Sequence, residues 1–322
     1  MELLSSLKEI QAGQKNRIES KNALFYALLF LSKKKTRSTG IKFLYTIWSH
    51  FFAPQLMTQY KLRQRPVAWV DHPLDKKIPF KPHHVSIYLS FTSLWLKSIG
   101  FLYREFGKQS LNEIIKFVEA LTSLYLESSK IFLQIQSTTN RPRYIGGFYF
   151  QVIHLFDPHL HCIPSLHVEI VCLNYTFMSK IIDKLATNPA EYQSEKDYLW
   201  RQAVLITDSI LLIKQHSVNC VAAGLFTLTS NNYPFEEKDA YQIIDTLFTG
   251  SGNTLAAGDE IRSYIHKLYQ HFLEEHRRKT NAKVLVDFLH AYPQKKQSTP
   301  RDPVFSQKGP RKSELRGSPG VM

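Results

Sequence analysis

Two short stretches of the chain place a histidine beside small polar or cationic residues at the start of an apolar helical run. The first is Cys162–His167, with the sequence CIPSLH, and the second is Lys214–His216, with the sequence KQH. Pro164 suits an early helical position and Ser165 can cap free N–H groups, so the first stretch predicts a helix N-terminus that favours an anion. Two histidines, a fixed cation and a helix N-terminus together predict phosphoryl transfer through a phosphohistidine.

The order of three motifs resembles the type 2 phosphatidic acid phosphatase and vanadium haloperoxidase superfamily. The motifs are Arg-Pro at Arg141, Pro-Ser-x-His ending at His167, and Ser-x(4)-Lys-Gln-His running from Ser209 to His216. The chain is most similar to the branch that contains the inositol phosphorylceramide synthase-like phosphotransferases. The resemblance covers roughly residues 130–225, and it implies an all-α helical bundle.

The resemblance also implies which residues bind the phosphoryl oxygens. Arg141 and Ser165 match phosphate-binding positions of the first and second motifs. Gln134 stands where the family has a lysine, and it brings an uncharged donor instead. Ile210 stands where the family usually has an arginine, so Lys214 is the available cation of the third motif.

By the same resemblance, His216 is the nucleophile and His167 is the general acid that protonates the leaving group. The family keeps an aspartate four residues after the nucleophile to orient it, but this chain has Cys220, and a thiol is a poor acceptor. Asn219 lies on a similar helix face and can orient the ring without adding charge.

Two hypotheses about function therefore stay open. The first is a metal-independent phosphatase or phosphotransferase that acts on a phosphomonoester or a lipid phosphate. The second is a weakened or inactive relative that binds phosphate, an anionic headgroup or a partner without turnover. The change to Cys220 favours the second hypothesis, whereas the joint presence of both histidines, Arg141 and Lys214 favours the first.

The composition predicts one helical domain followed by a basic tail. Of the 322 residues 43% are hydrophobic and only 13 are glycine, which allows a large core built from helices. We expect a single domain over 1–292. It begins with N-terminal helices and a Pro-rich connection at 1–84, continues with a catalytic-type core at 85–230 and ends with C-terminal helices at 231–292. Polar and basic residues dominate 293–322, which predicts a disordered tail.

The charge of the chain predicts an anionic partner. A net charge of +14 fits a phosphorylated small molecule, a lipid headgroup or the surface of a membrane. Nucleic acid is a weaker candidate, because no recognised nucleic-acid-binding module is present. The three cysteines do not form a disulfide framework, so we expect a cytoplasmic protein with peripheral membrane contact as an option. The sequence does not indicate an oligomeric state.

We expect no metal or other cofactor, because fixed cations can hold the phosphoryl oxygens. The segment from Asp157 to Cys162 adds His159 and His161, but its spacing is not a standard zinc pattern. We expect these side chains to line the mouth of the phosphate pocket.

Helical periodicity places most of the chain in helices and none in a clear membrane span, because the apolar runs are too short or too polar. The predicted helices are 21–32, 41–53, 84–106, 110–131, 167–185, 188–213, 216–230, 235–248, 258–279 and 281–291. A Pro-rich connection is expected over 54–84 and a glycine bend in 144–157.

The basic cluster at 33–37 lies between two apolar segments with several aromatic residues, and it has two interpretations. One is a solvated loop between core helices, and the other is an anchor at a membrane interface.

Overall fold

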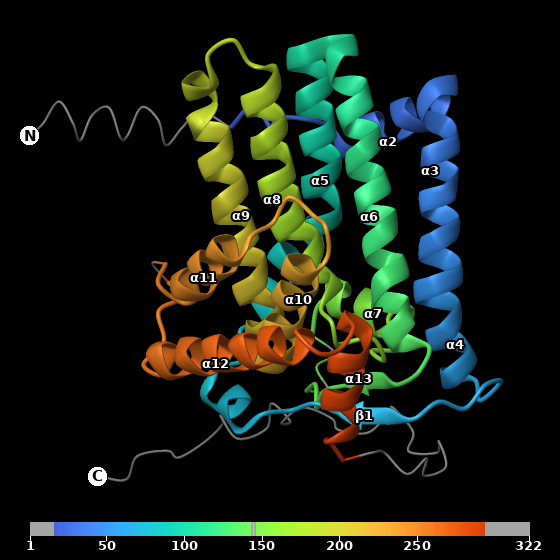
Figure 1. Cartoon of the computed structure of the whole chain (residues 1–322), viewed down its shortest axis with the longest axis vertical. Helices are drawn as coiled ribbons and strands as arrows, with labels where there is room; N and C mark the ends of the chain where they lie inside the picture. The colour runs from blue at the N-terminus through green and yellow to red at the C-terminus, as the bar shows by residue number, and fades with distance from the viewer. Residues whose placement is uncertain (1–15, 143, 145, 251, 294–322) are drawn as a thin grey trace, which may run out of the picture.

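The protein forms a bundle of long helices that stand side by side (Figure 1). The computed structural model describes residues 16–142, 144, 146–250 and 252–293. The upright helices are α3 (Lys34–Thr46), α5 (Val85–Phe106), α6 (Leu111–Phe132), α8 (Leu166–Leu185) and α9 (Gln193–Leu212). The predicted all-α class is confirmed, because helices dominate the described residues and only one small sheet accompanies them.

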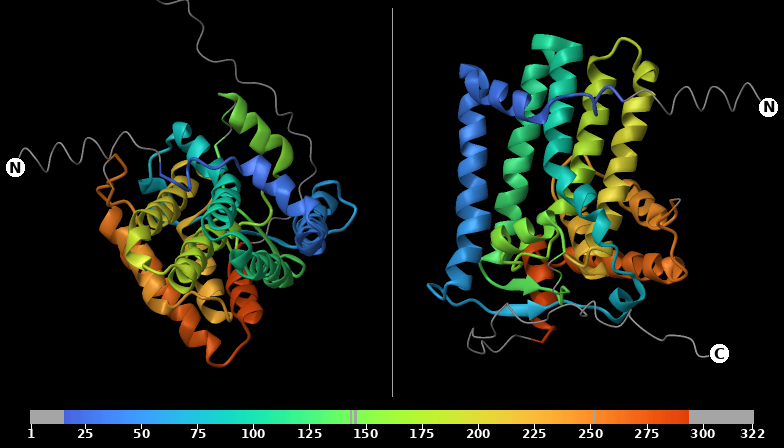
Figure 2. Two further views of the ribbon diagram at one scale, coloured as in Figure 1. Left: turned by 90° about the horizontal axis from the view of Figure 1, so that it is seen from above. Right: turned by 180° about the vertical axis from the view of Figure 1, so that it is seen from behind.

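The remaining helices lie at the two ends of the bundle and along its sides (Figures 1 and 2). They are α2 (Ala23–Ser32), α4 (Ala53–Gln59), α7 (Phe148–Phe156), α10 (Val218–Ser230), α11 (Glu237–Thr246), α12 (Gly258–His276) and α13 (Asn281–His290). The sheet pairs β1 (Val67–Trp69) with β2 (Gln136–Thr138) in parallel. It lies at the same end of the bundle as α10 and α13.

Amphipathic periodicity explains how the long helices pack. In α6 the residues Ile114, Phe117, Leu121 and Leu124 recur at helical spacing, and all four are buried. This stripe faces the core between α3 and α8, while the charged side chains of α6 remain in water. Burial of such a stripe, rather than intrinsic propensity, is the main source of stability for a helix in a protein.

The structure corrects the predicted connections at two places. The segment 54–84 contains α4, β1 and the 3₁₀ turns η2 (Pro73–Lys77) and η3 (Pro82–His84), because proline is tolerated in the first turn of a helix. The segment 144–157 contains α7 as well as the bend at Gly147, which has a φ of 88°. The predicted tail at 293–322 lies, apart from Pro293, outside the described residues.

Helix boundaries also differ from the predicted ones. Helix α3 begins at Lys34, so most of the basic cluster at 33–37 is helical. Only Lys33 separates α2 from α3, because its backbone is extended, with a φ of −80° and a ψ of 129°. Ser110 donates its hydroxyl to the carbonyl of Gly107 and does not cap α6. A 3₁₀ turn, η5 (Pro189–Tyr192), precedes α9 where a continuous helix was expected.

One helical stretch, Pro82–Phe132, is long and apolar enough to span a membrane by length and composition, and its most apolar 18-residue window has a mean hydropathy of 1.3. It contains α5, the 3₁₀ turn η4 (Gly107–Ser110) and α6, and 44% of its most apolar window is buried in the bundle. A core helix of a bundle passes the same test, so this stretch is weak evidence for a span.

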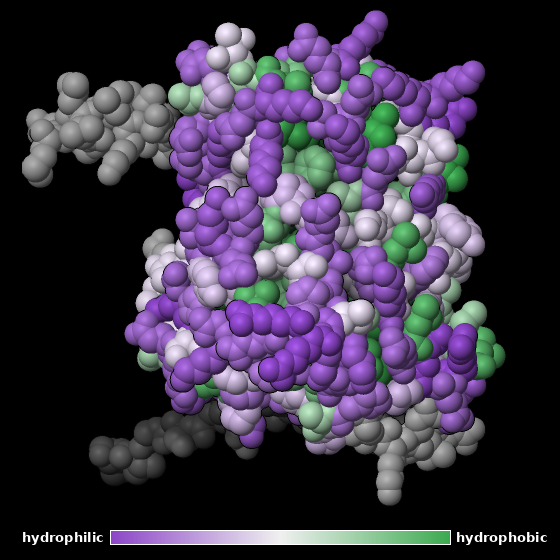
Figure 3. All heavy atoms as spheres, in the orientation of Figure 1, coloured by the Kyte–Doolittle hydropathy of each residue, from purple (hydrophilic) through white to green (hydrophobic). Residues whose placement is uncertain are grey.

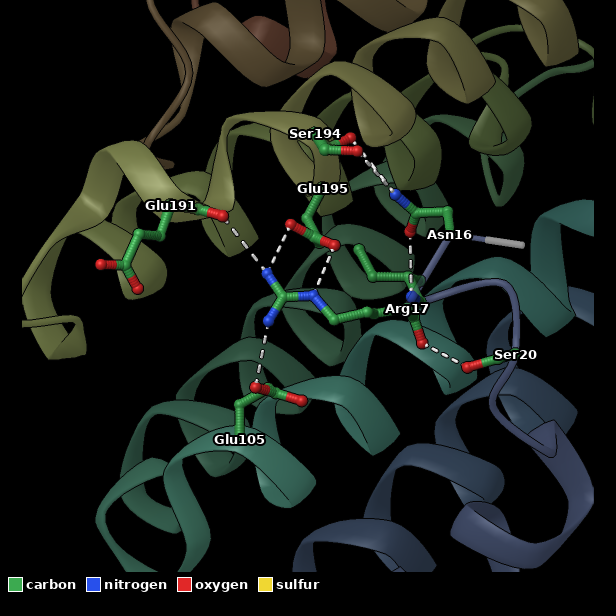
Figure 4. Close-up of polar contacts among 8 residues, drawn as sticks. Asn16, Arg17, Ser20, Glu105, Glu191, Ser194 and Glu195 are labelled. Atoms are coloured by element: carbon green, nitrogen blue, oxygen red, sulfur yellow. Dashed lines mark hydrogen bonds and ion pairs between the residues drawn. The ribbon is translucent and has the colours of Figure 1, made fainter. Parts of the chain in front are cut away.

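Arg17 and Asn16 fasten the segment before α2 to the bundle (Figure 4), and Asn16 donates to Ser194. Arg17 donates from Nε and Nη2 to the two carboxylate oxygens of Glu195, each at 2.8 Å, and its Nη1 lies 3.4 Å from Glu105. The guanidinium also lies over the ring of Tyr192, at 4.8 Å from the centroid. Because Glu195 is only 3% exposed, this bidentate pair is partly desolvated and stronger than a surface pair.

We predict that Arg17→Ala destabilises the protein more than loss of an ordinary surface ion pair. Without Arg17 the buried Glu195 carboxylate loses its partner, and the free energy of unfolding should fall by about 1–3 kcal/mol in urea titrations. Lys77→Ala is the matched control, because the Lys77–Glu260 pair is solvent-exposed and should contribute less than about 1 kcal/mol. Equal effects of the two substitutions would contradict the prediction.

Candidate functional site

The two histidines come from different parts of the bundle that meet at one end. Helix α8 begins at Leu166 with Ser165 at its N-cap, so His167 lies in the first turn and Pro164 lies just before the helix. After α9 ends at Leu212 the chain reverses at Lys214, which has a φ of 57°. This left-handed conformation normally favours glycine, so a lysine there stores strain at the turn that delivers His216.

His216 does not belong to α10, which begins two residues later at Val218. The N–H groups of Gln215 and His216 both donate to the carbonyl of Ile210, so the turn is fastened to the end of α9. The predicted helix at 216–230 is therefore shorter, and His216 sits in the turn between two helices.

The two imidazoles face each other inside a largely aromatic wall. The ring centroids of His167 and His216 are 5.4 Å apart, with an interplanar angle of 66°. Tyr88 stacks on His167 at 4.4 Å, and Phe91 lies at the same distance on a tilted plane. The predicted pairing of the two histidines is therefore present in the geometry.

Burial favours the neutral form of both rings. It lowers the pKa of His216 to about 4, against the opposing effect of the Cys162 backbone carbonyl. Burial and the neighbouring His216 lower the pKa of His167 well below its ordinary value. The Nδ1 atom of His216 is buried and makes no hydrogen bond with any described residue. In the described residues no carboxylate takes the orienting role that the resemblance assigns to an aspartate.

Arg141 is held in place by two acceptors on neighbouring segments. Its Nη1 donates to Oε1 of Gln215 at 3.2 Å, and its Nη2 donates to the carbonyl of Asp157 at the same distance. Asp71 accepts the backbone N–H of Asn140 at 2.9 Å, which fixes the chain just before the arginine. Gln215 therefore positions Arg141. The sequence analysis included Gln215 in the third motif but assigned it no role.

A cavity of about 570 Å³ lies beside His216. Arg141 and Lys214 line it together with His216, and it reaches solvent next to the exposed side chains of Asp71 and Lys76. A smaller cavity of about 20 Å³, large enough for a water molecule, lies on the other side and is lined by both candidate histidines. His216 therefore borders both spaces.

Lys214 and Asp75 connect the cavity wall to α10. The ammonium of Lys214 donates to the carbonyls of Asp75 and Ile78, which leaves one of its three protons for a ligand. The Asp75 carboxylate accepts the N–H of His72 at 2.7 Å and that of Val218 at 3.0 Å. Asp75 thus occupies the anion-favouring N-terminus of α10, so only the N-terminus of α8 remains for a ligand.

The other predicted site residues line neither of these two cavities. Ser165 is fully buried at the start of α8, and its hydroxyl has no hydrogen-bond partner among the described residues. Gln134 is exposed and donates to the carbonyl of Lys130. Asn219 donates to Val70 and Tyr292 and accepts from Tyr264, so its amide is occupied elsewhere.

Cys220 serves as a cap for α10. Its sulfur accepts the N–H of Ser217 at 3.4 Å, and burial raises its pKa well above the ordinary value. The thiol therefore stays protonated and contributes no charge to the site.

The His- and Cys-containing segment before α8 forms part of the wall. His159 contacts the hydroxyl of Thr139 through Nε2 at 2.8 Å, and the sulfur of Cys162 lies 3.6 Å from the same nitrogen. Burial lowers the pKa of His159 well below its ordinary value. Within the described ranges, no group of three or more His, Cys, Asp or Glu side chains has the geometry to hold a metal ion.

Comparison of the chain with family models, with curated proteins and with solved structures gave no match.

We predict that Gly224 cannot gain a side chain without disturbing this site. A Cβ on Gly224 would lie 3.1 Å from the backbone oxygen of Ser165 and 3.2 Å from Cβ of Val168. Gly224→Ala should therefore push α10 away from the start of α8 and lower the free energy of unfolding by about 1–3 kcal/mol.

Gly258→Ala is the matched control for this substitution. Gly258 is also helical, but a Cβ there meets only the guanidinium of Arg262, at 3.1 Å from Nη1, and meets no backbone atom. Because alanine has a higher helix propensity than glycine, Gly258→Ala should stabilise the protein by up to about 1 kcal/mol. If Gly224→Ala stabilises the protein as much as Gly258→Ala in the same denaturant titration, the contact between α8 and α10 is not tight and the prediction is wrong.

Proposed function

We propose that this protein is a metal-independent phosphatase or phosphotransferase that acts on a phosphomonoester or lipid phosphate through a phosphohistidine at His216. The observation that carries the proposal is the meeting of His167 and His216, at 5.4 Å between ring centroids, beside Arg141 and the cavity. The resemblance to the phosphatidic acid phosphatase and haloperoxidase superfamily gives the same two histidines the same two roles.

In the proposed first step, a ring nitrogen of His216 attacks phosphorus and the bond from phosphorus to the ester oxygen breaks. His167 gives its proton to the departing oxygen, so the leaving group departs as a neutral alcohol. Water or a second alcohol then takes the phosphoryl group from His216, with His167 accepting a proton. Arg141, Lys214 and the N–H groups at the start of α8 stabilise the charge on the phosphoryl oxygens.

The lowered pKa values of the two histidines mean that His167 must gain a proton before it can act as the acid in this mechanism. His216 is neutral and nucleophilic at any pH above about 4, given its lowered pKa. His167 needs a proton to act as an acid, and burial disfavours that proton until an anion is present. A bound dianion supplies the missing negative charge, so ligand and proton should bind together.

The first experiment tests the nucleophile. Release of phosphate from phosphomonoesters and lipid phosphates should fall by about 10³-fold or more in His216→Ala, because no other group forms the covalent intermediate. His83→Ala is the control, because His83 is exposed and lines neither cavity. Activity that persists in His216→Ala would reject the assignment.

The second experiment tests the coupling between anion and proton by calorimetry with sulfate, which stays dianionic over the range used. The sulfate dissociation constant should fall by up to about tenfold for each unit that the pH is lowered from 8 to 6, because one proton enters with the anion. Titrations in buffers of different ionisation enthalpy should report that proton directly. His167→Gln should bind sulfate with little pH dependence, and an unchanged slope in this variant would contradict the coupling.

The second candidate function is binding without turnover. It is favoured by the absence of any described carboxylate near the buried Nδ1 of His216 and by the engagement of Asn219 and Cys220 elsewhere. Sulfate binding of the kind described above, together with no phosphate release from any substrate, would select this candidate.

A further inference from the structure

Large hydrophobic side chains are exposed on only one part of the described surface. Thirteen such residues are exposed, and they lie within 24–62, at Leu133 and at Phe148 and Tyr149. The described residues of 63–132 and of 150–292 contribute none. Figure 3 shows the face that carries α11 and α12 as mostly hydrophilic, with hydrophobic residues toward the side that carries α3 and α4. A gathering of this kind is characteristic of an interaction surface.

Helix α3 is apolar on two faces. Gly40 and Phe43 pack inward against the bundle, as expected for a core helix. On the opposite face, Ile41, Leu44 and Trp48 follow each other at helical spacing across the junction with the π-helical segment η1 (Ile47–Phe52). Leu44 is 52% exposed and Trp48 is 58% exposed, so among the described residues nothing covers this second stripe.

Helix α2 extends the same surface. None of its ten residues is fully buried, although nearly all are apolar, and Leu24 is 68% exposed. Helix α2 contacts α3 and α5, and it lies on the opposite side of the bundle from α12 when viewed from above (Figure 2). We call the exposed faces of α2, α3, η1 and α4, from Leu24 to Leu62, the outer apolar surface.

The charge around the outer apolar surface has one sign. Between Lys21 and Val70 the sequence contains nine Lys and Arg residues and no Asp or Glu. Lys34 and Lys35 are exposed at the start of α3 and Lys42 is exposed in its second half, while Lys61 and Arg63 are exposed beyond the end of α4. Apolar and aromatic side chains flanked by cations are the pattern of a protein that lies on an anionic membrane.

We propose that the outer apolar surface binds a lipid bilayer that carries anionic headgroups. The apolar side chains enter the boundary between headgroups and acyl chains, Trp48 and Tyr60 occupy the interface, and the lysines contact lipid phosphates. A second copy of the chain is a poor occupant, because a symmetric contact would bring two basic regions together. This inference does not depend on catalysis at His216.

The test is flotation of the full-length protein with vesicles of phosphatidylcholine containing about 30% phosphatidylserine. Wild type should float with these vesicles at low salt. Leu44→Ser combined with Trp48→Ser should weaken binding by about tenfold or more, because both side chains lose their transfer into the bilayer. Both positions are exposed, so thermal unfolding should remain as in wild type.

A charge variant separates the two contributions. Lys34→Glu combined with Lys35→Glu should weaken binding to anionic vesicles by about tenfold or more. Arg277→Glu combined with Arg278→Glu is the matched control, because these exposed arginines follow α12, away from the outer apolar surface, and should leave binding unchanged.

Three results would overturn the proposal. The first is wild type that does not float at low salt, and the second is a Leu44 and Trp48 variant that floats as well as wild type. The third is self-association of wild type in lipid-free buffer that the same variant abolishes, which would make a second copy the occupant. None of these assays involves turnover, so a negative result would reject the membrane-binding proposal and leave the proposed phosphatase activity to its own tests.

Discussion

The close approach of α8 and α10 is the constraint on which the candidate site depends. Gly224 lets the backbone of α10 come near the carbonyl of Ser165, at the start of α8. That contact sets the distance between the turn that carries His216 and the first turn of α8 that carries His167. Asp75 reinforces it from the other side, because its carboxylate caps α10 while its carbonyl accepts from Lys214.

Burial then decides the electrostatics of the site. The two imidazoles lie among aromatic rings, and burial favours the neutral form of both. Arg141 and Lys214 bring positive charge to the cavity wall, and Gln215 and Asp157 hold Arg141 in position. Among the described residues, no carboxylate contacts Nδ1 of His216 to make that ring cationic.

The sequence predicted the long helices and the pairing of the histidines, because periodicity and motif order are local signals. It missed α4 and α7, whose flanking prolines and glycines resemble loop signals, and it placed His216 inside a helix that begins later. The role of Gln215 and the capping by Asp75 arise from contacts between distant segments. No spacing rule predicts such contacts, and a short buried strand such as β1 leaves too few residues to show a pattern.

Periodicity also left the basic segment at 33–37 with two interpretations, because a helix that is apolar on two faces gives no clear inward side. In the fold, one face of α3 packs and the other stays exposed, and the lysines stand at its end. The chain leads from this surface to the cavity within a short distance. Leu62 is seven residues from Trp69, which lines the cavity, so the two lie at most about 25 Å apart. The two proposals together therefore predict a phosphate carried by a lipid headgroup, rather than one free in solution, as the ligand of the cavity that His216 borders.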